Sequence, residues 1–149
     1  MILIETASEA TEEVVDAIGR LLPFLSRSAP APTPAQVAEM VESPATTVLL
    51  ARDTDTRRIV GTLTLVMFRI PSAVRAIIED VIVSEEARGQ GCGELLTKSA
   101  IDLAAKAGVK TVDLTSRPSR EAANRLYLRV GFVKRETNVY RYTLGADDD

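Results

Sequence analysis

The sequence predicts an α/β (α+β) fold, and three observations indicate it. Two apolar, β-branched runs at 46–52 and 59–68 flank the polar turn 53–56, which favours an antiparallel hairpin. A strand at 75–83, a glycine-rich loop and a helix then follow directly. Of the 149 residues, 46% are hydrophobic and 26% charged, as expected for one globular domain with its own core.

The first half of the chain contains four more expected elements. They are a strand, a helix, a loop and a short helix, at 1–5, 8–22, 26–32 and 33–43. Pro23 ends the first of these helices because proline lacks the N–H that the helix needs. Thr33, Pro34 and Gln36 predict the start of the second, as N-cap, first helical residue and capping-box partner.

The second half begins with a helix after Gly93 and ends with a hairpin. The helix is indicated by apolar residues at spacings of three and four, and Gly108 ends it. A strand, a helix and a final hairpin are expected at 111–114, 119–130, and 133–134 with 138–143. The acidic segment 145–149 is expected to be disordered, which leaves 1–144 as the single domain.

Composition excludes several classes of function. The net charge of −3 argues against nonspecific electrostatic binding of nucleic acid. One cysteine allows no disulfide within the chain, and neither a signal peptide nor a membrane-spanning run is present, so we expect a cytoplasmic protein. The absence of histidine removes Ser-His-Asp catalysis and histidine zinc sites, so no metal is expected.

The loop after the 75–83 strand has the composition of an anion cradle. Glycines let backbone N–H groups approach an anion, and the first amides of a helix lack partners. A Walker A loop is excluded because no Gly-Lys-Ser/Thr occurs, and a Rossmann fingerprint counted from Gly89 fails at Glu94. The arrangement that fits is R-x-x-G-x-G, formed by Arg88, Gly91 and Gly93. An ordinary strand, loop and helix is the alternative.

This motif resembles the pyrophosphate loop of the GNAT superfamily of acetyl-CoA-dependent N-acyltransferases. The order of expected elements is also similar to the fold of that family, which is a mixed, mostly antiparallel sheet with helices on both faces. The resemblance implies a splayed strand at Val81, Ile82 and Val83, in a V-x-V-like run. The residues that it implies for binding acetyl-CoA are Val81, Ile82, Val83, Arg88, Gly89, Gln90, Gly91, Cys92, Gly93 and Asn124.

A second motif lies at the end of the 119–130 helix. The run from Leu126 to Phe132 resembles the L-Y-x-x-x-G-F signature of the same family, whose tyrosine is the usual general acid; here it is Tyr127. Many family members carry asparagine where this chain has Arg120, so Asn124 is expected to take a related role. Arg117 and Arg120 either bind an anionic group or are solvated surface residues. Tyr127 as a plain core residue is the alternative.

The chemistry of amine acetylation needs a base and an acid. Without histidine, Glu79 is the candidate base, although its ordinary pKa of ~4.3 requires burial or an intervening water. Strand alternation places Asp80 on the opposite face. A salt-bridged strand residue is the alternative for Glu79. Cys92 at a helix N-terminus could in principle form an acyl-enzyme, but nothing else in the sequence indicates one.

The resemblance therefore implies an N-acetyltransferase that moves an acetyl group from acetyl-CoA to a primary amine by direct attack. The acceptor is left open among small amines, peptide N-termini and protein lysines, and a small amine is favoured because no acidic run offers a docking surface. The resemblance also implies a homodimer, with 138–143 as an edge strand. The rival hypotheses are a non-catalytic acyl-CoA-binding or regulatory module and a generic nucleotide-phosphate binder.

Overall fold

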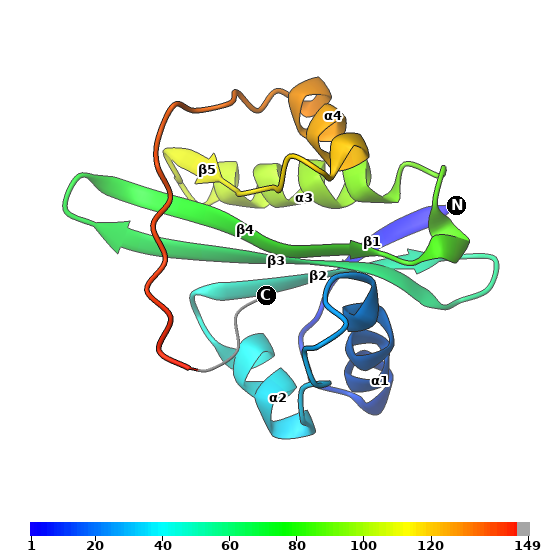
Figure 1. Ribbon diagram of the computed structural model, residues 1–149. Helices are drawn as coiled ribbons and strands as arrows, with labels where there is room; N and C mark the ends of the chain where they lie inside the picture. Colours follow the sequence, from blue (N-terminus) through cyan, green and yellow to red (C-terminus); the bar gives the residue numbers. More distant parts are fainter. Residues whose placement is uncertain (146–149) are drawn as a thin grey trace.

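Five strands form one sheet in which each strand lies beside the next one in the chain (Figure 1). The computed structural model describes residues 1–145. The strands are β1 (Ile2–Thr6), β2 (Thr46–Asp53), β3 (Ile59–Ile70), β4 (Ala73–Val83) and β5 (Thr111–Asp113). Strands β1 to β4 pair antiparallel, and β5 pairs parallel to β4. The expected mixed, mostly antiparallel sheet is confirmed.

Helices cover both faces of this sheet (Figure 1). One face carries α1 (Glu12–Leu21), η1 (Leu22–Phe24) and α2 (Pro34–Glu42); the other carries α3 (Cys92–Lys106) and α4 (Glu121–Val130), and the short η2 (Glu85–Ala87) precedes α3. The predicted capping box of α2 is confirmed. Gln36 N donates to Thr33 Oγ1 at 3.1 Å, and Thr33 N donates to Gln36 Oε1 at 2.9 Å.

Two hydrophobic clusters fill the layers on either side of the sheet. One cluster joins Leu49, Leu63, Leu65 and Ile78 of the sheet to Leu96 and Ala100 of α3, and the other joins Val48, Leu50 and Ile82 of the sheet to Val14 and Leu21 of α1 and Val37 of α2. Alternate residues of β2 enter opposite clusters, because successive side chains of a strand point to opposite faces. The sheet therefore separates two hydrophobic cores, one on each face.

The pairing between β4 and β5 is short. It covers only Arg75 with Thr111, Ala76 with Val112 and Ile77 with Asp113. Beyond these residues, β4 continues to Val83 without a strand on that side, while β5 ends and leads toward α4. The two strands therefore separate after Ile77, as the resemblance implied, and leave an edge of β4 facing open space.

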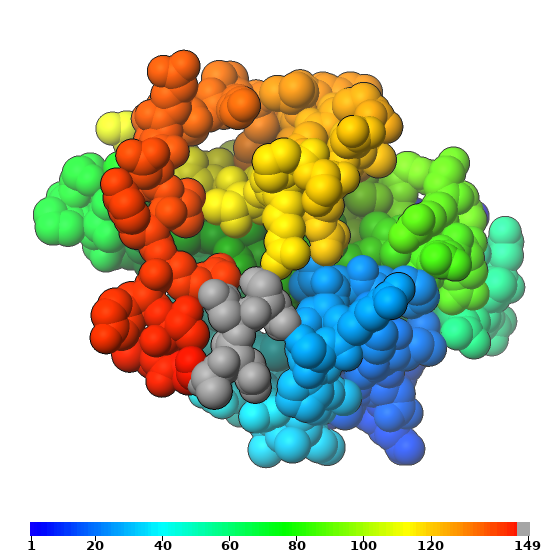
Figure 2. Space-filling view, in the orientation of Figure 1, coloured from blue at the N-terminus to red at the C-terminus, as the bar shows by residue number. Residues whose placement is uncertain are grey.

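The predicted final hairpin at 133–134 and 138–143 is wrong. Within the described residues no strand follows β5, and residues 132–144 run along the surface, orange to red in Figure 2. The alternating pattern reflects strand propensity, which requires a partner to become a ladder. Instead, Val139, Tyr140 and Tyr142 are 75%, 88% and 88% exposed. The disorder predicted for 145–149 stays a prediction, because 146–149 lie outside the described residues.

None of the helices in residues 1–145 is both long enough and apolar enough to cross a membrane.

Candidate active site

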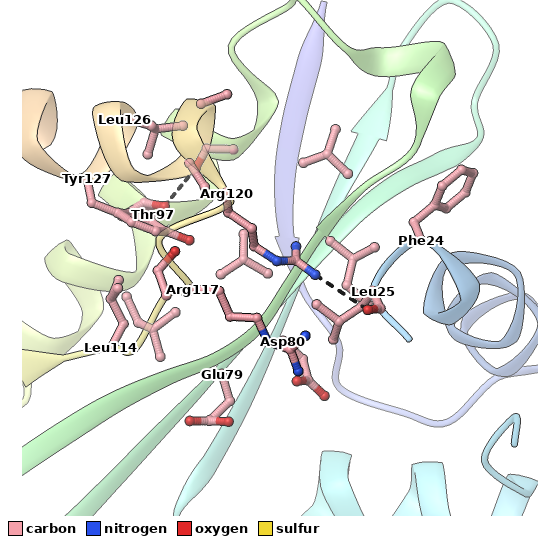
Figure 3. A pocket seen from close by; sticks show the side chains of 18 of the residues that line it. Phe24, Leu25, Glu79, Asp80, Thr97, Leu114, Arg117, Arg120, Leu126 and Tyr127 are labelled. Carbon is pink, nitrogen blue, oxygen red and sulfur yellow. Dashed lines mark hydrogen bonds between the residues drawn. The ribbon is translucent and has the colours of Figure 1, made fainter. Parts of the chain in front are cut away.

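A cavity of about 1040 Å³ opens where β4 and β5 separate. The edge of β4 from 78 to 83 forms its floor, and the loop before α3 forms one end. The segment 114–117 and α4 form one wall, and residues 22–26 after α1 form the facing wall. Figure 3 shows side chains from these elements converging on this space. Val139 and Arg141 of the surface segment also border it.

The glycine-rich loop has the backbone geometry of an anion cradle. Gly89 and Gly91 have positive φ values of 80° and 72°, and Gly91 is the N-cap of α3. The amides of Cys92, Gly93 and Glu94 therefore start a helix and have no intrahelical partner, at the positive end of its dipole. An ideal Cβ on Gly91 would meet nothing within 4 Å, so the space over the loop is open to a ligand.

A β-bulge in β4 changes which side chains reach the cavity. Glu79 pairs with Thr64 and Ile82 with Thr62, so Asp80 and Val81 together oppose the single residue Leu63. Asp80 adopts a left-handed φ of 48° at this bulge. The expectation that Asp80 points to the opposite face is wrong, because the bulge breaks the alternation. Both Glu79 and Asp80 line the cavity (Figure 3).

The environment of Glu79 suits a base. Partial burial in the cavity raises the pKa of its carboxyl, and the neighbouring charge of Asp80 raises that pKa further. The positive charge of Arg141 acts in the opposite direction and is the smaller effect. The Glu79 side chain is nevertheless exposed at the mouth of the cavity, so water and an acceptor can both reach it.

Tyr127 lines the same cavity from α4. Its ring packs edge-on against Phe132, with centroids 5.8 Å apart and planes at 71°. The helix ends at Gly131, and Phe132 N donates to Tyr127 O at 2.9 Å, which fixes the turn that follows. Burial raises the pKa of the Tyr127 phenol, and the Arg120 guanidinium lowers it by less. The phenol therefore carries its proton at neutral pH.

Cys92 lies beneath the glycine loop and is 2% exposed. Burial raises the pKa of its thiol to about 11. Its Sγ packs so closely on β3 that an ideal Cβ at Gly61 would lie 3.0 Å from it. A buried, protonated thiol in this position is a poor nucleophile, which argues against an acyl-enzyme.

The structure brings most of the predicted site residues together, with two exceptions. The cavity is bordered by Glu79, Tyr127, Val81, Ile82, Val83, Arg88, Gly89, Gly91, Cys92 and Gly93. Gln90 and Asn124 do not border it: Gln90 Nε2 donates to Glu86 O at 3.3 Å, and Asn124 Nδ2 donates to Arg117 O at 3.0 Å. Asn124 thereby holds the 117 loop against α4, a role that the helical pattern could not indicate.

Several residues of the cavity were absent from the sequence-based prediction. One wall comes from η1 and the residue after it, and it includes Leu22, Phe24 and Leu25. This segment carries no motif and precedes Tyr127 by about 100 residues in the chain. Arg117 and Arg120 also line the cavity, although a solvated role was the alternative considered for them. Ser116 Oγ is buried beside the cavity and makes no hydrogen bond within the structure. Such an orphaned hydroxyl suits a polar ligand.

The donor chemistry of the cavity fits an acyl-CoA better than a metal ion. In the described part of the chain, no group of three or more His, Cys, Asp or Glu side chains could hold a metal. The cavity instead combines an apolar strand edge with main-chain amides at a helix start and with arginines such as Arg88 and Arg125. Amides and guanidinium groups suit phosphates, and the strand edge suits an amide-containing arm.

The fold is that of the acyltransferase class, and comparison with known families agrees. Residues 15–132 match the acetyltransferase (GNAT) family. The chain belongs to this family. Among curated proteins, N-alpha-acetyltransferase 30 of Schizosaccharomyces pombe is 32% identical over 77 residues, which are 52% of this chain and 51% of that protein. The match thus spans about half the length of that relative.

Solved structures share the fold over nearly the whole chain. A transcriptional regulator from Bacillus halodurans C-125 is 25% identical, with a TM-score of 0.83 over 96% of this chain and 100% of that one. An aminoglycoside acetyltransferase from an uncultured soil metagenomic sample, in complex with sisomicin, has a TM-score of 0.85 at 19% identity, covering 97% of both chains. The second likeness concerns the fold alone.

Proposed function

We propose that this protein transfers an acetyl group from acetyl-CoA to a primary amine by direct attack within a ternary complex. The observation that carries the proposal is the separation of β4 from β5, with Glu79 and Tyr127 lining the cavity and a glycine loop at its end. An acyl-CoA fits this arrangement if its phosphates lie on the loop from Arg88 to Gly93. Its arm would then follow the free edge of β4.

The first step is deprotonation and attack. An alkylammonium has a pKa of ~10.4, so well under one per cent of the amine is neutral at pH 7 and a base must take a proton. Glu79, whose pKa is raised, accepts that proton directly or through water. The amine nitrogen then bonds to the thioester carbon, and strand amides near Val81 to Val83 stabilise the resulting oxyanion.

The second step is departure of the thiol. The carbon–sulfur bond breaks, the nitrogen of the new amide loses its second proton to solvent, and the Tyr127 O–H donates its proton to the sulfur. A thiol has a pKa of ~8.5 and tyrosine one of ~10, so this transfer is uphill by about 2 kcal/mol before environmental effects. Burial raises the pKa of Tyr127 and so adds to that difference. Solvent then returns the proton from Glu79 to Tyr127.

A small free amine is the acceptor that the cavity favours. Arg117, Arg120 and Arg141 border the cavity near Glu79 and Asp80, and their charge disfavours a basic peptide or a lysine-rich segment. The relative from Schizosaccharomyces pombe carries the name of an N-alpha-acetyltransferase, which makes peptide N-termini the competing acceptor class. A homodimer is part of this proposal, although the 138–143 strand that was expected to form its edge is not a strand in the described residues.

Calorimetric titration with acetyl-CoA, beside ATP and NAD, tests the donor. Selective micromolar binding of acetyl-CoA is expected, whereas equal binding of ATP or NAD would support a generic nucleotide binder. An amine panel that includes free diamines, amino acids and peptides, followed by thiol release, then tests the acceptor. Failure of every acyl-CoA to bind would refute the proposal.

The second candidate is a non-catalytic acyl-CoA-binding or regulatory module. The neighbour from Bacillus halodurans, described as a transcriptional regulator, favours it because it covers 96% of this chain at 25% identity. A Tyr127→Phe variant separates the two functions. Under the enzymatic proposal, this variant binds acetyl-CoA normally and turns over about 10-fold or more slowly. If no amine is acetylated while acetyl-CoA binds, the regulatory function is favoured.

A further inference from the structure

Arg120 crosses the cavity and is not used by the chemistry proposed above. It is the residue immediately before α4, and its Nη2 donates to the carbonyl oxygen of Leu25 at 3.4 Å. The two residues are 95 positions apart, so this contact joins the walls built by the two ends of the chain (Figure 3). The Leu25 carbonyl thereby holds the guanidinium inside the cavity.

The charge of Arg120 is not neutralised by an ion pair. Within residues 1–145, no carboxylate lies within ion-pair distance of its guanidinium, and its partner Leu25 O carries only a partial charge. Arg129 on the same helix differs, because its Nε lies 3.1 Å from Glu94 Oε1. Arg120 therefore presents a full positive charge to the cavity.

Tyr127 lies beside the same cavity as Arg120, Tyr127 on α4 and Arg120 immediately before that helix. Both line the cavity, where their side chains extend into one space (Figure 3). The Arg120 charge favours the ionised form of the phenol, against the effect of burial.

We propose that Arg120 is a positioning residue for the acid step: held by the Leu25 carbonyl, its guanidinium stabilises the Tyr127 phenolate formed when the phenol protonates the departing thiolate. In that step the O–H bond of Tyr127 breaks, an S–H bond forms, and the negative charge moves from sulfur to the phenol oxygen. The inference rests on the proposed function, in which Tyr127 is the acid.

Other charged groups also face the cavity around Tyr127. They are Glu79 and Asp80 on β4, Arg88 before α3, Arg117 before α4, Arg125 and Arg129 on α4, and Arg141 of the surface segment. All of them remain when Arg120 alone is substituted. A change in the titration of Tyr127 in that variant therefore reports the Arg120 charge rather than the charge of the whole cavity.

The composition of the chain permits a direct test. It has three tyrosines and no tryptophan, so a Tyr140→Phe/Tyr142→Phe background leaves Tyr127 as the single source of phenolate absorbance. In this background, Arg120→Gln is expected to move the midpoint of the Tyr127 titration to higher pH. Arg120→Lys keeps the charge and is expected to leave that midpoint nearer to the value of the parent protein. Arg135→Gln removes the same charge from an exposed residue outside the cavity and is expected to move nothing.

Turnover provides the second readout. Arg120→Gln is expected to lower kcat by about 10-fold and to move its alkaline limb in the same direction as the titration, while Arg135→Gln keeps the parent values. Arg120→Met, which keeps the aliphatic stem, replaces Arg120→Gln if circular dichroism shows that the latter does not fold.

If the midpoint of the Tyr127 titration is unchanged or lower in Arg120→Gln, the inference is overturned. The titration requires no substrate, so it separates this inference from the proposed function. If Tyr127→Phe retained the full transfer rate, Tyr127 would not be the acid, yet the coupling to Arg120 would still be measured. An inactive Tyr127→Phe with no coupling would refute this inference alone.

Discussion

Glu79 and Asp80 are consecutive residues of β4, and both of their carboxylates enter the same cavity. The positive φ of Asp80 and the bulge opposite Leu63 make this possible, since a regular strand would send them to opposite faces. Burial raises the pKa of the Glu79 carboxyl, and the negative charge of the adjacent Asp80 raises that pKa further.

Substituting Asp80 should therefore change the pH dependence of the reaction. A base works when ionised, so kcat/KM falls as pH decreases through the pKa of Glu79. Asp80→Asn removes a negative neighbour, lowers that pKa and moves the acidic limb to lower pH. Arg141→Gln removes a positive charge and moves the limb to higher pH. Steady-state rates against pH measure both.

The matched control is Asp113→Asn, which makes the same change on β5 outside the cavity and should leave the limb in place. Glu79→Gln should lower kcat by about 10²-fold. Full activity of Glu79→Gln would show that water or another group is the base.

Gly91 should be needed for ligand binding rather than for folding alone. Alanine at its φ of 72° costs about 1 kcal/mol of stability and places a methyl group over the anion cradle. Gly108→Ala is the matched control, because Gly108 has a φ of 77° at the far end of α3 and does not border the cavity. Both variants should unfold at similarly lower urea concentrations, but only Gly91→Ala should weaken acetyl-CoA binding. Equal affinities would contradict the cradle.

The thiol of Cys92 should react slowly in the folded protein. With a pKa of about 11 and 2% exposure, it has little thiolate near neutral pH and little access to reagents. Iodoacetamide labelling followed by mass spectrometry should be far slower in buffer than in urea, and should accelerate as pH approaches 11. Rapid labelling of the native protein at neutral pH would restore the acyl-enzyme hypothesis.

Arg52 should contribute measurably to stability. Its guanidinium joins Glu5 on β1 at 2.8 Å and Glu13 on α1 at 2.9 Å, and its Nη1 also donates to Arg57 O at 2.7 Å. Arg52→Met should lower the free energy of unfolding by about 1–2 kcal/mol in urea titrations. Arg58→Met, which removes an exposed pair with Glu86, should change it by less than about 0.5 kcal/mol.

Acid should weaken the same cluster. The hydrogen bond from Arg52 lowers the pKa of Glu13, so its contribution is complete above the unfolded pKa and is lost as pH falls through the folded pKa. The stability difference between parent and Arg52→Met should therefore shrink in acid. A difference that stays constant with pH would show that packing, rather than charge, is responsible.

Local chemistry made much of the fold predictable. The capping box at Thr33 and the helix after the glycine loop follow from short-range patterns, which act before tertiary contacts form. Tyr127 was named from the family resemblance and Glu79 from the need for a base, and both line the cavity. The bulge at Asp80 was not predictable, because it depends on pairing between strands rather than on the sequence of β4. Leu25 was missed for the same reason: only the packed chain brings it opposite Arg120.

The final hairpin shows a different limit. Residues 138–143 alternate as a strand does, but period and propensity do not specify a partner. The structure leaves these residues at the surface, and Asn138 Nδ2 donates to its near neighbour Tyr140 Oη at 3.4 Å. A pattern identifies an element reliably only when the rest of the chain supplies what it must pair with.

Because β4 and β5 separate early, one part of the cavity is built from main-chain atoms and the rest from side chains. The open edge of β4 and the glycine loop present main-chain groups, which no single side-chain replacement deletes. The two facing walls instead contribute side chains, such as Phe24 of η1 and Arg117 before α4, which a single mutation can replace. If the proposed function holds, substitutions in these walls can change which acceptors enter, while the main-chain groups that would bind the donor are retained.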